Sequence, residues 1–313
     1  MRAIAIDGFG GSDELTLHDL EDPKVGPDSV LIRVRAAGVN PVDFKIREGR
    51  LEAAFPHRFP LVPGWDAAGT VEAVGPAVTD LTIGDEVYAY CRKTEISEGA
   101  YAELVSVPQT HVARKPERAS MVAAAGVPLA ALTAWQCVSE KLALRDGQTV
   151  LVTAAAGGVG HFAVQLARSL GAEVIGTASE VNHDFVRSLG ADAVIDYGDG
   201  DVGAQVRDRH PDGVDAVVDL YGGAVLTDAS GALRNGGQVV SIADPDPTGG
   251  AEDITGHYVF VRPDGAQLGE LARLYDDGRL TTEVAEAFPL AGAAAAHDRL
   301  EEGHVRGKLV LEV

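Results

Sequence analysis

Cysteine, aromatic residues and long apolar runs are all scarce in this 313-residue sequence. Cys91 and Cys137 are too few for a disulfide framework and show no metal-ligand spacing, which favours a reducing compartment. No segment reaches the length of a membrane span, and the first residues contain no secretory signal. We therefore expect a cytoplasmic protein with no membrane partner.

Positive charge is also scarce, because 26 Lys and Arg residues stand against 47 Asp and Glu residues. The formal net charge of −21 argues against a surface that binds nucleic acid or an anionic membrane, since phosphate groups need clustered Lys and Arg. Any anionic ligand must therefore be held by a local site.

The first part of the chain, residues 1–118, consists of short extended segments broken by Gly and Pro, and it predicts an all-β half. The predicted strands are Arg2–Ile6, Ser29–Ala36, Ala67–Val74, Glu86–Tyr90, Ala102–Val107 and His111–Ala113. From Ser120 the pattern changes to Ala- and Leu-rich segments, which predict helices over Met121–Leu132 and Ala134–Leu142.

The remainder alternates strands with helices, which predicts an α/β fold with a doubly wound parallel sheet. Predicted strands are Thr149–Thr153, Glu173–Thr177, Ala193–Asp196, Ala216–Asp219, Gln238–Ile242, Tyr258–Val261 and Thr282–Ala287. Predicted helices are His161–Leu170, Val181–Leu189, Gly203–Arg209, Ala224–Ala232 and Ala266–Asp276. The last β run, Lys308–Val313, could rejoin the N-terminal half.

The most informative stretch is the turn Ala154-x-x-Gly157-x-x-Gly160, between a buried strand and an amphipathic helix. Small residues let a backbone approach a pyrophosphate closely, while the free N–H groups and the positive dipole end of the helix attract its charge. The usual fingerprint has Gly where this turn has Ala154, so the motif alone also allows a tight turn without a ligand. The turn predicts a dinucleotide site.

Several motifs, in order along the chain, resemble the zinc-independent quinone oxidoreductases of the medium-chain dehydrogenase/reductase superfamily. They are AAGVNPVDFKIREG (Ala36–Gly49), PGWDAAGTVEAVG (Pro63–Gly75), LTIGDEVYAY (Leu81–Tyr90), GAYAELVSV (Gly99–Val107), the glycine turn, GTAS (Gly176–Ser179), LGADAVIDY (Leu189–Tyr197) and the terminal GKLVLEV. The resemblance implies a GroES-like β-barrel-type catalytic domain over residues 1–118 and 264–313. It also implies a Rossmann domain over residues 119–263, with the active cleft between the two domains.

The resemblance implies a set of cofactor-binding residues. They are Thr133, Ala156, Gly157, Gly158, Val159, Gly160, Ser179, His183, Tyr197, Ile242, Ala243, Val259, Phe260, Val261 and Lys308. The strand after the glycine turn ends at Ser179 without the carboxylate that NAD sites use to bind the ribose, which favours NADPH. Arg187 is a further source of positive charge, whereas Glu180 opposes a phosphate.

Zinc is not expected, because catalytic zinc needs three protein ligands and the relevant segments lack them. Where the zinc-dependent branch has Gly-His-Glu, this sequence has Gly64-Trp65-Asp66, and Asn40-Pro41-Val42-Asp43 lacks the family cysteine. Without a Lewis acid, hydride transfer suits a quinone or an α,β-unsaturated carbonyl compound, which delocalises negative charge onto its own oxygen.

The resemblance places Asn40, Asp43 and Lys45 as catalytic candidates. An ammonium at Lys45 would stabilise an enolate-like oxygen or position a protonating water, although a surface lysine fits the sequence as well. Asn40 and Asp43 also suit a turn beside Pro41. No Tyr proton donor is evident.

Two other functions stay open on the sequence. One is an enoyl-thioester reductase of a biosynthetic pathway, and the other is a catalytically silent NADPH-binding redox sensor. A homodimer is expected from the resemblance, through edge-strand pairing near Tyr258–Val261.

Overall fold

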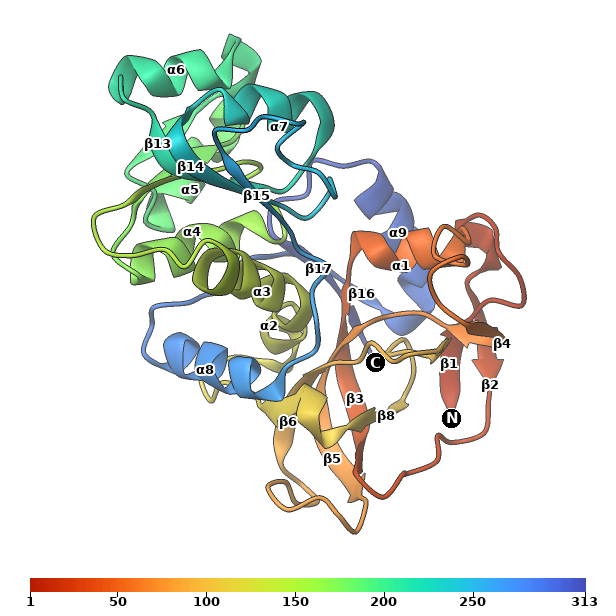
Figure 1. Ribbon diagram of the computed structural model, residues 1–313. Helices are drawn as coiled ribbons and strands as arrows, with labels where there is room; N and C mark the ends of the chain where they lie inside the picture. The colour runs from red at the N-terminus through yellow and green to blue at the C-terminus, as the bar shows by residue number, and fades with distance from the viewer. The chain divides into compact units, whose positions relative to one another are not determined.

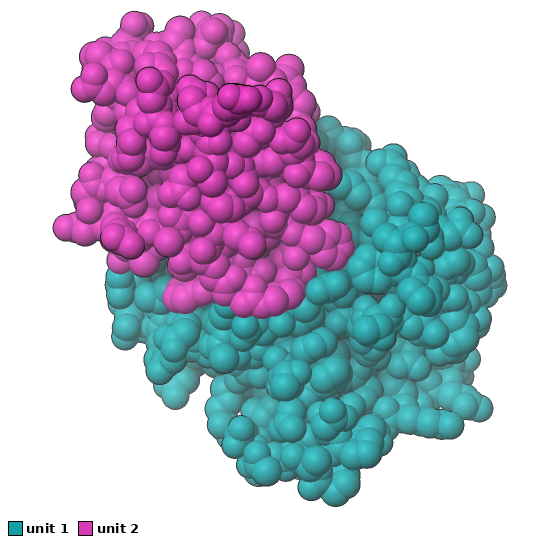
Figure 2. Space-filling view, viewed as in Figure 1, with its two compact units in different colours: residues 1–129, 263–313 teal, residues 130–262 magenta.

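The computed structural model describes residues 1–313, which divide into two compact units. Unit 1 combines Met1–Leu129 with Pro263–Val313, and unit 2 is Ala130–Arg262 (Figure 2). The chain therefore builds most of unit 1, completes unit 2, and returns to unit 1 at Pro263.

Unit 1 is organised around β3 (Ser29–Val39), the longest strand of the chain. The strands β5 (Asp66–Val74), β8 (Leu104–Pro108) and β17 (Lys308–Glu312) all pair with it in antiparallel fashion. The same sheet contains β6 (Glu86–Tyr90), β9 (Val112–Arg114) and β16 (Val284–Pro289). Its order is β16-β17-β3-β5-β6-β9, with β8 also on β3. Figure 1 labels all of these strands except β9.

The C-terminal strand β17 rejoins the N-terminal half, as the sequence predicts. Leu309 lies opposite Val39 of β3, and Glu312 lies opposite Ala36. Because Lys308 begins β17 and Asn40 follows β3 directly, this pairing brings the two residues side by side. A register set by backbone pairing thus builds part of the site described below.

Unit 1 also has two small sheets, one antiparallel of β1 (Arg2–Ala5) with β2 (Thr16–Asp19) and one parallel of β4 (His57–Val62) with β7 (Ile96–Glu98). Its helices are α1 (Pro41–Arg47), α2 (Met121–Ala125), α8 (Gly265–Asp276) and α9 (Ala293–Glu301), with 3-10 turns at Ser12–Glu14, Gln109–His111 and Leu290–Gly292. The prediction of an all-β half is therefore wrong at α1. Proline at the first helical position and an acidic residue in the first turn favour a helix there.

Unit 2 contains a six-stranded parallel sheet in the order β12-β11-β10-β13-β14-β15, which confirms the predicted fold class. Its strands are β10 (Thr149–Val152), β11 (Glu173–Thr177), β12 (Ala193–Ile195), β13 (Val214–Asp219), β14 (Leu233–Ser241) and β15 (Thr255–Tyr258). Its helical segments are α4 (Gly160–Ser169), α5 (His183–Ser188), α6 (Val202–Arg209), α7 (Gly223–Ser230), a π-helix at Gln136–Lys141, and 3-10 turns at Glu180–Asn182 and Tyr197–Asp199.

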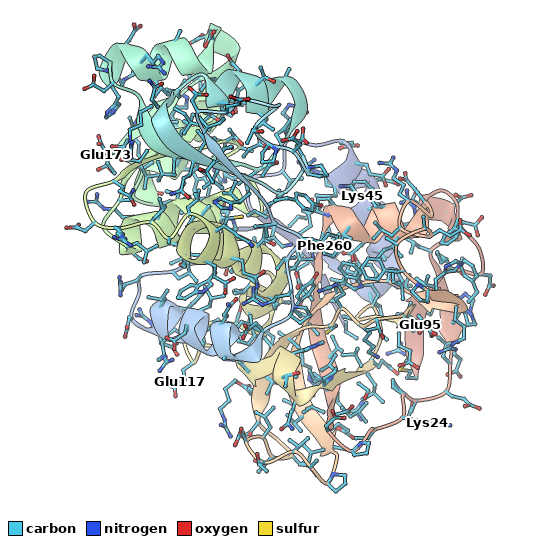
Figure 3. The ribbon with its side chains drawn as sticks, in the orientation of Figure 1. Lys24, Lys45, Glu95, Glu117, Glu173 and Phe260 are labelled. Carbon is cyan, nitrogen blue, oxygen red and sulfur yellow. The ribbon has the colours of Figure 1, made fainter.

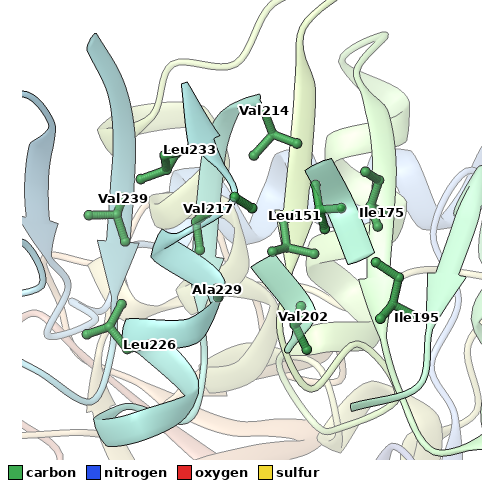
Figure 4. Close-up of a cluster of buried hydrophobic side chains, with 12 residues drawn as sticks. Leu151, Ile175, Ile195, Val202, Val214, Val217, Leu226, Ala229, Leu233 and Val239 are labelled. Carbon is green, nitrogen blue, oxygen red and sulfur yellow. The ribbon is translucent and has the colours of Figure 1, made fainter. Parts of the chain in front are cut away.

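The inner strands of this sheet are rich in Val, Ile and Leu because both of their faces are covered. Figure 4 shows one covered face, where Val202 of α6 and Leu226 of α7 pack with Leu151, Ile175 and Val217 of the strands. Burial on this face fixes the strand register, and with it the edge at which the strands end.

Three predicted elements differ from the structure. The helix predicted over Met121–Leu132 is divided into α2 and α3 (Pro128–Trp135), because proline disfavours helical backbone at the residue before it. The helix predicted over Ala134–Leu142 is mostly the π-helix, and the strand predicted over Tyr258–Val261 ends at Tyr258, where it was expected to begin.

None of the helices is both long enough and apolar enough to cross a membrane.

Candidate active site

In unit 2, the turn between β10 and α4 is closed by a contact that only glycine permits. A Cβ atom built on Gly160 would lie 2.1 Å from the carbonyl oxygen of Ala154. Ala154 has a φ of 47°, in the left-handed region that favours glycine. The turn thus keeps a glycine-like backbone at the position where the usual fingerprint has Gly.

The turn presents backbone amides at the N-terminus of α4. His161 N donates to Gly157 O at 3.1 Å, so the hydrogen bonds of α4 within the protein begin at His161. The amides of Gly158–Gly160 come before this bond, at the end of the helix where backbone N–H groups have no partner within the helix. Together with the positive end of the helix dipole, they can bind a pyrophosphate. Ala156 is buried beneath the turn.

Three predicted residues, Ser179, His183 and Tyr197, follow β11 and β12, which are neighbours in the sheet. Ser179 Oγ accepts a hydrogen bond from Asn182 Nδ2 at 3.2 Å, and His183 Nε2 lies 3.9 Å from Asp196 Oδ2. Tyr197 is 50% exposed. Because parallel strands end at one edge, the fold gathers these residues there.

The charge near Ser179 is mixed. Arg187 pairs with Asp184 at 3.0 Å on the exposed surface of α5, so part of its charge is already compensated. Glu180 is exposed at the start of the 3-10 turn. His183 Nε2 lies 3.2 Å from the backbone oxygen of Ala178 as well as near Asp196.

Sequence reasoning misses Asp219, a buried carboxylate at the end of β13. Its Oδ1 accepts hydrogen bonds from Gly222 N at 3.0 Å and Tyr221 N at 3.2 Å, and lies 3.4 Å from Thr153 Oγ1. Its Oδ2 accepts from Ser241 Oγ at 2.6 Å. Asp219 thus joins the ends of three neighbouring strands, β10, β13 and β14. The sequence signal is an acidic residue that ends an apolar strand before two glycines.

Two predicted cofactor segments meet at Ser241. Ala243 N donates to Ser241 Oγ at 3.0 Å, and Val259 N donates to Ser241 O at 3.0 Å. Ile242 lies within the first segment, and Phe260, which is 47% exposed, follows Val259 in the second. The structure therefore brings the segments Ile242–Ala243 and Val259–Val261 together.

The π-helix holds the residue that follows the second segment. Gln136 Nε2 donates to Arg262 O at 3.0 Å, and Arg262 N donates to Gln136 Oε1 at 3.1 Å. The Arg262 guanidinium also pairs with both carboxylate oxygens of Glu140, at 2.7 and 2.6 Å. Thr133, another predicted residue, is buried nearby in sequence on α3.

In unit 1, the three catalytic candidates lie along α1, with Asn40 and Asp43 at its start and Lys45 in its last turn. Asn40 is the N-cap residue, and its backbone N–H donates to Asp43 Oδ2 at 2.8 Å. Asn40 and Asp43 are 2% and 0% exposed. Lys45 is exposed on the same helix (Figure 3), so it is the one candidate of the three whose side chain can reach a ligand.

Behind α1 lies a buried cluster of Asn40, Asp66 and Lys308. Asn40 Nδ2 donates to Asp66 Oδ2 at 2.8 Å, and Lys308 Nζ contacts Asn40 Oδ1 and donates to Val39 O at 3.0 Å. Lys308 Nζ lies 3.9 Å from Asp66 Oδ2, and Asp66 Oδ1 accepts from Leu129 N at 2.7 Å. The cluster joins β3, β5, β17 and the first turn of α3.

Burial shifts the proton affinities in this cluster. It raises the pKa of Asp43 to about 7 and that of Asp66 to about 6, against the opposing effect of the Lys308 charge. Burial lowers the pKa of Lys308, while the charges of Asp66 and Asp43 raise it. Desolvation dominates all three shifts because each side chain is removed from water.

The geometry gives Lys308, Asn40 and Asp43 partners inside the protein. Lys308 is 3% exposed, and its ammonium is engaged with Val39 and Asn40, so the structure does not present it to a cofactor. The polar atoms of the Asn40 side chain are used by Asp66 and Lys308, and Asp43 is fully buried. The sequence motif does not reveal these partners because they are distant along the chain.

Comparison with known proteins covers both units. Residues 26–117 match the family model described as alcohol dehydrogenase GroES-like domain, and residues 189–311 match the one described as zinc-binding dehydrogenase. The chloroplastic quinone-oxidoreductase homolog of Spinacia oleracea is 32% identical over 329 residues, which cover 100% of this chain and 98% of that protein.

A second relative and a solved structure are also similar to this chain. The chloroplastic NADPH-dependent alkenal/one oxidoreductase of Arabidopsis thaliana is 35% identical over 320 residues, with 99% of this chain and 79% of that protein covered. The quinone oxidoreductase structure from Coxiella burnetii has a TM-score of 0.90 and 35% identity, covering 100% of this chain and 99% of that chain.

This chain belongs to the quinone oxidoreductase branch of the medium-chain dehydrogenase/reductase superfamily. As a member of that branch it is an oxidoreductase enzyme, and its N-terminal part is a GroES-like domain. The glycine turn, the Asn40–Asp43 motif and the terminal Lys308 motif, on which the sequence resemblance rests, each have a defined place in the structure of this member.

The zinc in one family-model description does not fit the residues of this quinone oxidoreductase. Asp66 already accepts hydrogen bonds from Asn40 and Leu129 and faces an internal ammonium. Trp65, at the position of the zinc-branch histidine, packs edge-on against Phe55 and Tyr90 at ring distances of 6.1 and 6.0 Å. No group of three His, Cys, Asp or Glu side chains is placed to hold a metal ion. The oxygen atoms of Asn40 and Asp66 lie near the Lys308 ammonium, and they lack the Cys and His ligands that zinc prefers.

Proposed function

We propose that the protein is a zinc-free, NADPH-dependent reductase that transfers hydride to a quinone or an α,β-unsaturated carbonyl compound. The observation that carries the proposal is the buried Lys308–Asn40–Asp66 cluster, because it occupies the region where the zinc branch keeps metal ligands. The names of the spinach and Arabidopsis relatives support both acceptor classes.

The proposed NADPH site combines the amides of Gly158–Gly160 with the residues around Ser179. When bound, the nicotinamide group would supply hydride. The helix N-terminus would hold the pyrophosphate, and Ser179, His183 and Tyr197 would contact the adenosine ribose and its 2′-phosphate. The segments at Ile242–Ala243 and Val259–Val261, anchored on Ser241, would contact the carboxamide end.

Lys45 is the proposed electrostatic partner of the substrate. Reduction of a conjugated carbonyl places negative charge on its oxygen, and an ammonium nearby would stabilise that charge. Lys45 is exposed, whereas Lys308 is buried inside the protein. Of these two lysines, Lys45 is therefore the one whose ammonium would contact the substrate. Asn40 and Asp43 then act by holding the start of α1.

The activity is tested by following NADPH oxidation with a panel of small quinones, enones and enoyl thioesters. The proposal expects turnover with at least one quinone or enone. Turnover confined to enoyl thioesters would favour the enoyl reductase alternative. Tight NADPH binding without any turnover would favour the redox sensor.

The role of Lys45 is tested by Lys45→Ala, with Lys24→Ala as the matched control. Both lysines are exposed in unit 1 (Figure 3), but Lys24 lies outside the motif. Loss of one buried charge-stabilising donor costs other enzymes about 100- to 1000-fold in kcat. Because Lys45 is exposed, we expect Lys45→Ala to lower kcat by a smaller factor, about 10- to 100-fold, and Lys24→Ala to leave it unchanged. Equal kcat in the two variants would remove Lys45 from the mechanism.

The choice of NADPH is tested by Ser179→Asp, with Ser188→Asp on α5 as the control. A carboxylate at residue 179 would repel the 2′-phosphate and bind the unphosphorylated ribose. We expect Ser179→Asp to raise KM for NADPH at least about tenfold while KM for NADH stays similar or falls. If wild-type protein uses NADH as efficiently as NADPH, the cofactor assignment is wrong.

We also propose that the Rossmann domain spans residues 119–263 and that the catalytic domain spans residues 1–118 and 264–313. The protein is proposed to be cytoplasmic and to form a homodimer. The edge strand β15 supports the dimer, because its outer side has no partner strand within the unit and Tyr258 and Phe260 are 39% and 47% exposed. Light scattering on wild-type protein and on Tyr258→Asp/Phe260→Asp tests it. A monomeric wild type would refute the dimer.

A further inference from the structure

A chain of buried polar side chains connects α9 to Asp43 in unit 1. Arg47 Nη1 lies 3.4 Å from His297 Nδ1, His297 Nε2 lies 3.2 Å from Tyr101 Oη, and Tyr101 Oη donates to Asp43 Oδ2 at 3.2 Å. Arg47 is 2% exposed, and the other three side chains are 0% exposed. No sequence motif groups these residues, which come from three separate parts of the chain.

The hydrogen bonds of this chain run in one direction. Arg47 has only donors, so His297 Nδ1 must accept, and the imidazole proton then sits on Nε2. Nε2 donates to the Tyr101 oxygen, which leaves the Tyr101 hydroxyl hydrogen for Asp43. Burial and the Arg47 charge lower the pKa of His297 to about 3, which keeps the ring neutral. The charge of Arg47 is balanced by Glu301 at 2.9 Å.

The chain ends on the carboxylate that fixes the first turn of α1. Asp43 Oδ2 accepts from both Asn40 N and Tyr101 Oη, whereas its buried Oδ1 has no hydrogen-bond partner. Two donors on one oxygen hold the carboxylate in a single orientation. The hydrogen bond from Asn40 N is the one that caps the helix, and the bond from Tyr101 is a second donor that orients the Asp43 carboxylate.

Charged and titratable groups face Asp43 from several elements. The carboxylate of Asp66 on β5 repels its charge, and the ammonium of Lys308 on β17 attracts it. Burial raises the pKa of Tyr90 on β6, and the charge of Asp43 adds a smaller increase. Among these groups Tyr101 is the one that donates a side-chain hydrogen bond directly to Asp43.

We propose that Tyr101 and His297 are positioning residues of the reductase: they donate in series into the Asp43 carboxylate and thereby hold the start of α1, and with it Lys45, for reaction. This inference rests on the proposed function of Lys45.

The test compares Tyr101→Phe with Tyr88→Phe. Tyr88 is an equally buried tyrosine of the same unit, and its hydroxyl donates to Leu268 O at 2.6 Å, away from Asp43. Each variant removes one buried hydroxyl. Tyr101→Phe loses the hydrogen bonds to Asp43 and from His297, and Tyr88→Phe loses the one to Leu268. Kinetics with NADPH and an accepted quinone would be measured from pH 5.5 to 8.5, together with urea unfolding over the same range.

We expect Tyr101→Phe to lower kcat at least about fivefold with little change in KM for NADPH, and Tyr88→Phe to leave kcat unchanged. Loss of the Tyr101 donor also raises the pKa of Asp43, so the pH dependence of unfolding should move upward by about one pH unit in that variant only. Equal effects of the two variants on kcat and on the pH dependence would overturn the proposal.

Two variants of His297 keep the proposal testable if Tyr101→Phe folds poorly. His297→Gln can accept from Arg47 and donate to Tyr101, so it preserves the direction of the chain, whereas His297→Leu fills the space without either bond. We expect kcat within about twofold of wild type for the first variant and a loss like that of Tyr101→Phe for the second. Full kcat in His297→Leu would refute the positioning role. If wild-type protein reduces no acceptor, the proposed function fails, while the unfolding measurement still reports whether Tyr101 acts on Asp43.

Discussion

Replacing Asp43 by Asn should change how the stability of unit 1 depends on pH. The pKa of Asp43 is raised from 3.8 to about 7 by burial, so the folded protein keeps a proton that the unfolded chain releases at lower pH. The free energy of unfolding therefore falls as the pH rises from about 4 to about 7. Asn at residue 43 has no proton to release, and its contribution to this fall disappears.

The size of the effect follows from the pH interval that can be measured. The sequence pI is about 4.7, and solubility is poorest near that pH, so measurements should begin at about pH 5.5. Between that pH and the pKa of about 7 lie about 1.5 pH units, each worth about 1.4 kcal/mol for one proton. From pH 5.5 to 8.5, Asp43→Asn should gain about 2 kcal/mol of stability relative to wild type.

The assay is urea unfolding followed by tryptophan fluorescence in a Trp135→Phe background. Trp65 then reports on unit 1 alone, since the protein has two tryptophans and Trp135 lies in unit 2. Comparing the change with pH, rather than the stability at one pH, cancels the constant cost of altered hydrogen bonds at Asn40 and Tyr101.

A matched control is Asp85→Asn. Asp85 is also a hydrogen-bonded carboxylate of unit 1, but the amide of Thr82 and the charge of Arg114 lower its pKa. Its proton release is therefore complete below pH 5.5, and this variant should differ from wild type by a constant amount over the same range. A constant difference for Asp43→Asn as well would show that Asp43 does not titrate with a raised pKa.

Three further predictions concern single contacts. Ala154→Gly should raise the free energy of unfolding of unit 2 by about 1 kcal/mol in urea titrations, because alanine at a φ of 47° is strained; a loss of stability would contradict this. Lys308→Met should lower the stability of unit 1 by about 3–5 kcal/mol in the same assay at pH 8, because it leaves the Asp66 charge buried without its cation. A loss below about 1 kcal/mol would refute the buried pair. Gln136→Leu should raise KM for NADPH several-fold with a smaller change in kcat, because it removes both hydrogen bonds to the backbone of Arg262, next to the proposed carboxamide segment. Unchanged kinetics would show that Gln136 does not position this segment for NADPH.

The sequence alone was enough to predict the parallel sheet of unit 2 and its glycine turn. Strand and helix periods are local properties, and a small-residue turn must lie next to the strand and helix that it joins. The family resemblance likewise rests on residues that are contiguous, such as Asn40–Lys45 and the terminal GKLVLEV motif. These parts of the site could be recognised without knowing how the chain folds back on itself.

Only the tertiary structure decided what the buried polar residues do. Asp219 is one acidic residue among many until three strand ends meet at it, and Lys308 becomes an internal cation only because β17 pairs with β3. The partners of Asp43 lie 58 residues away, at Tyr101, and, through Tyr101, a further 196 residues along the chain, at His297. Hydrogen-bond partners so distant in sequence leave no periodic or motif signal, because only the packing of strands and helices brings them within bonding distance.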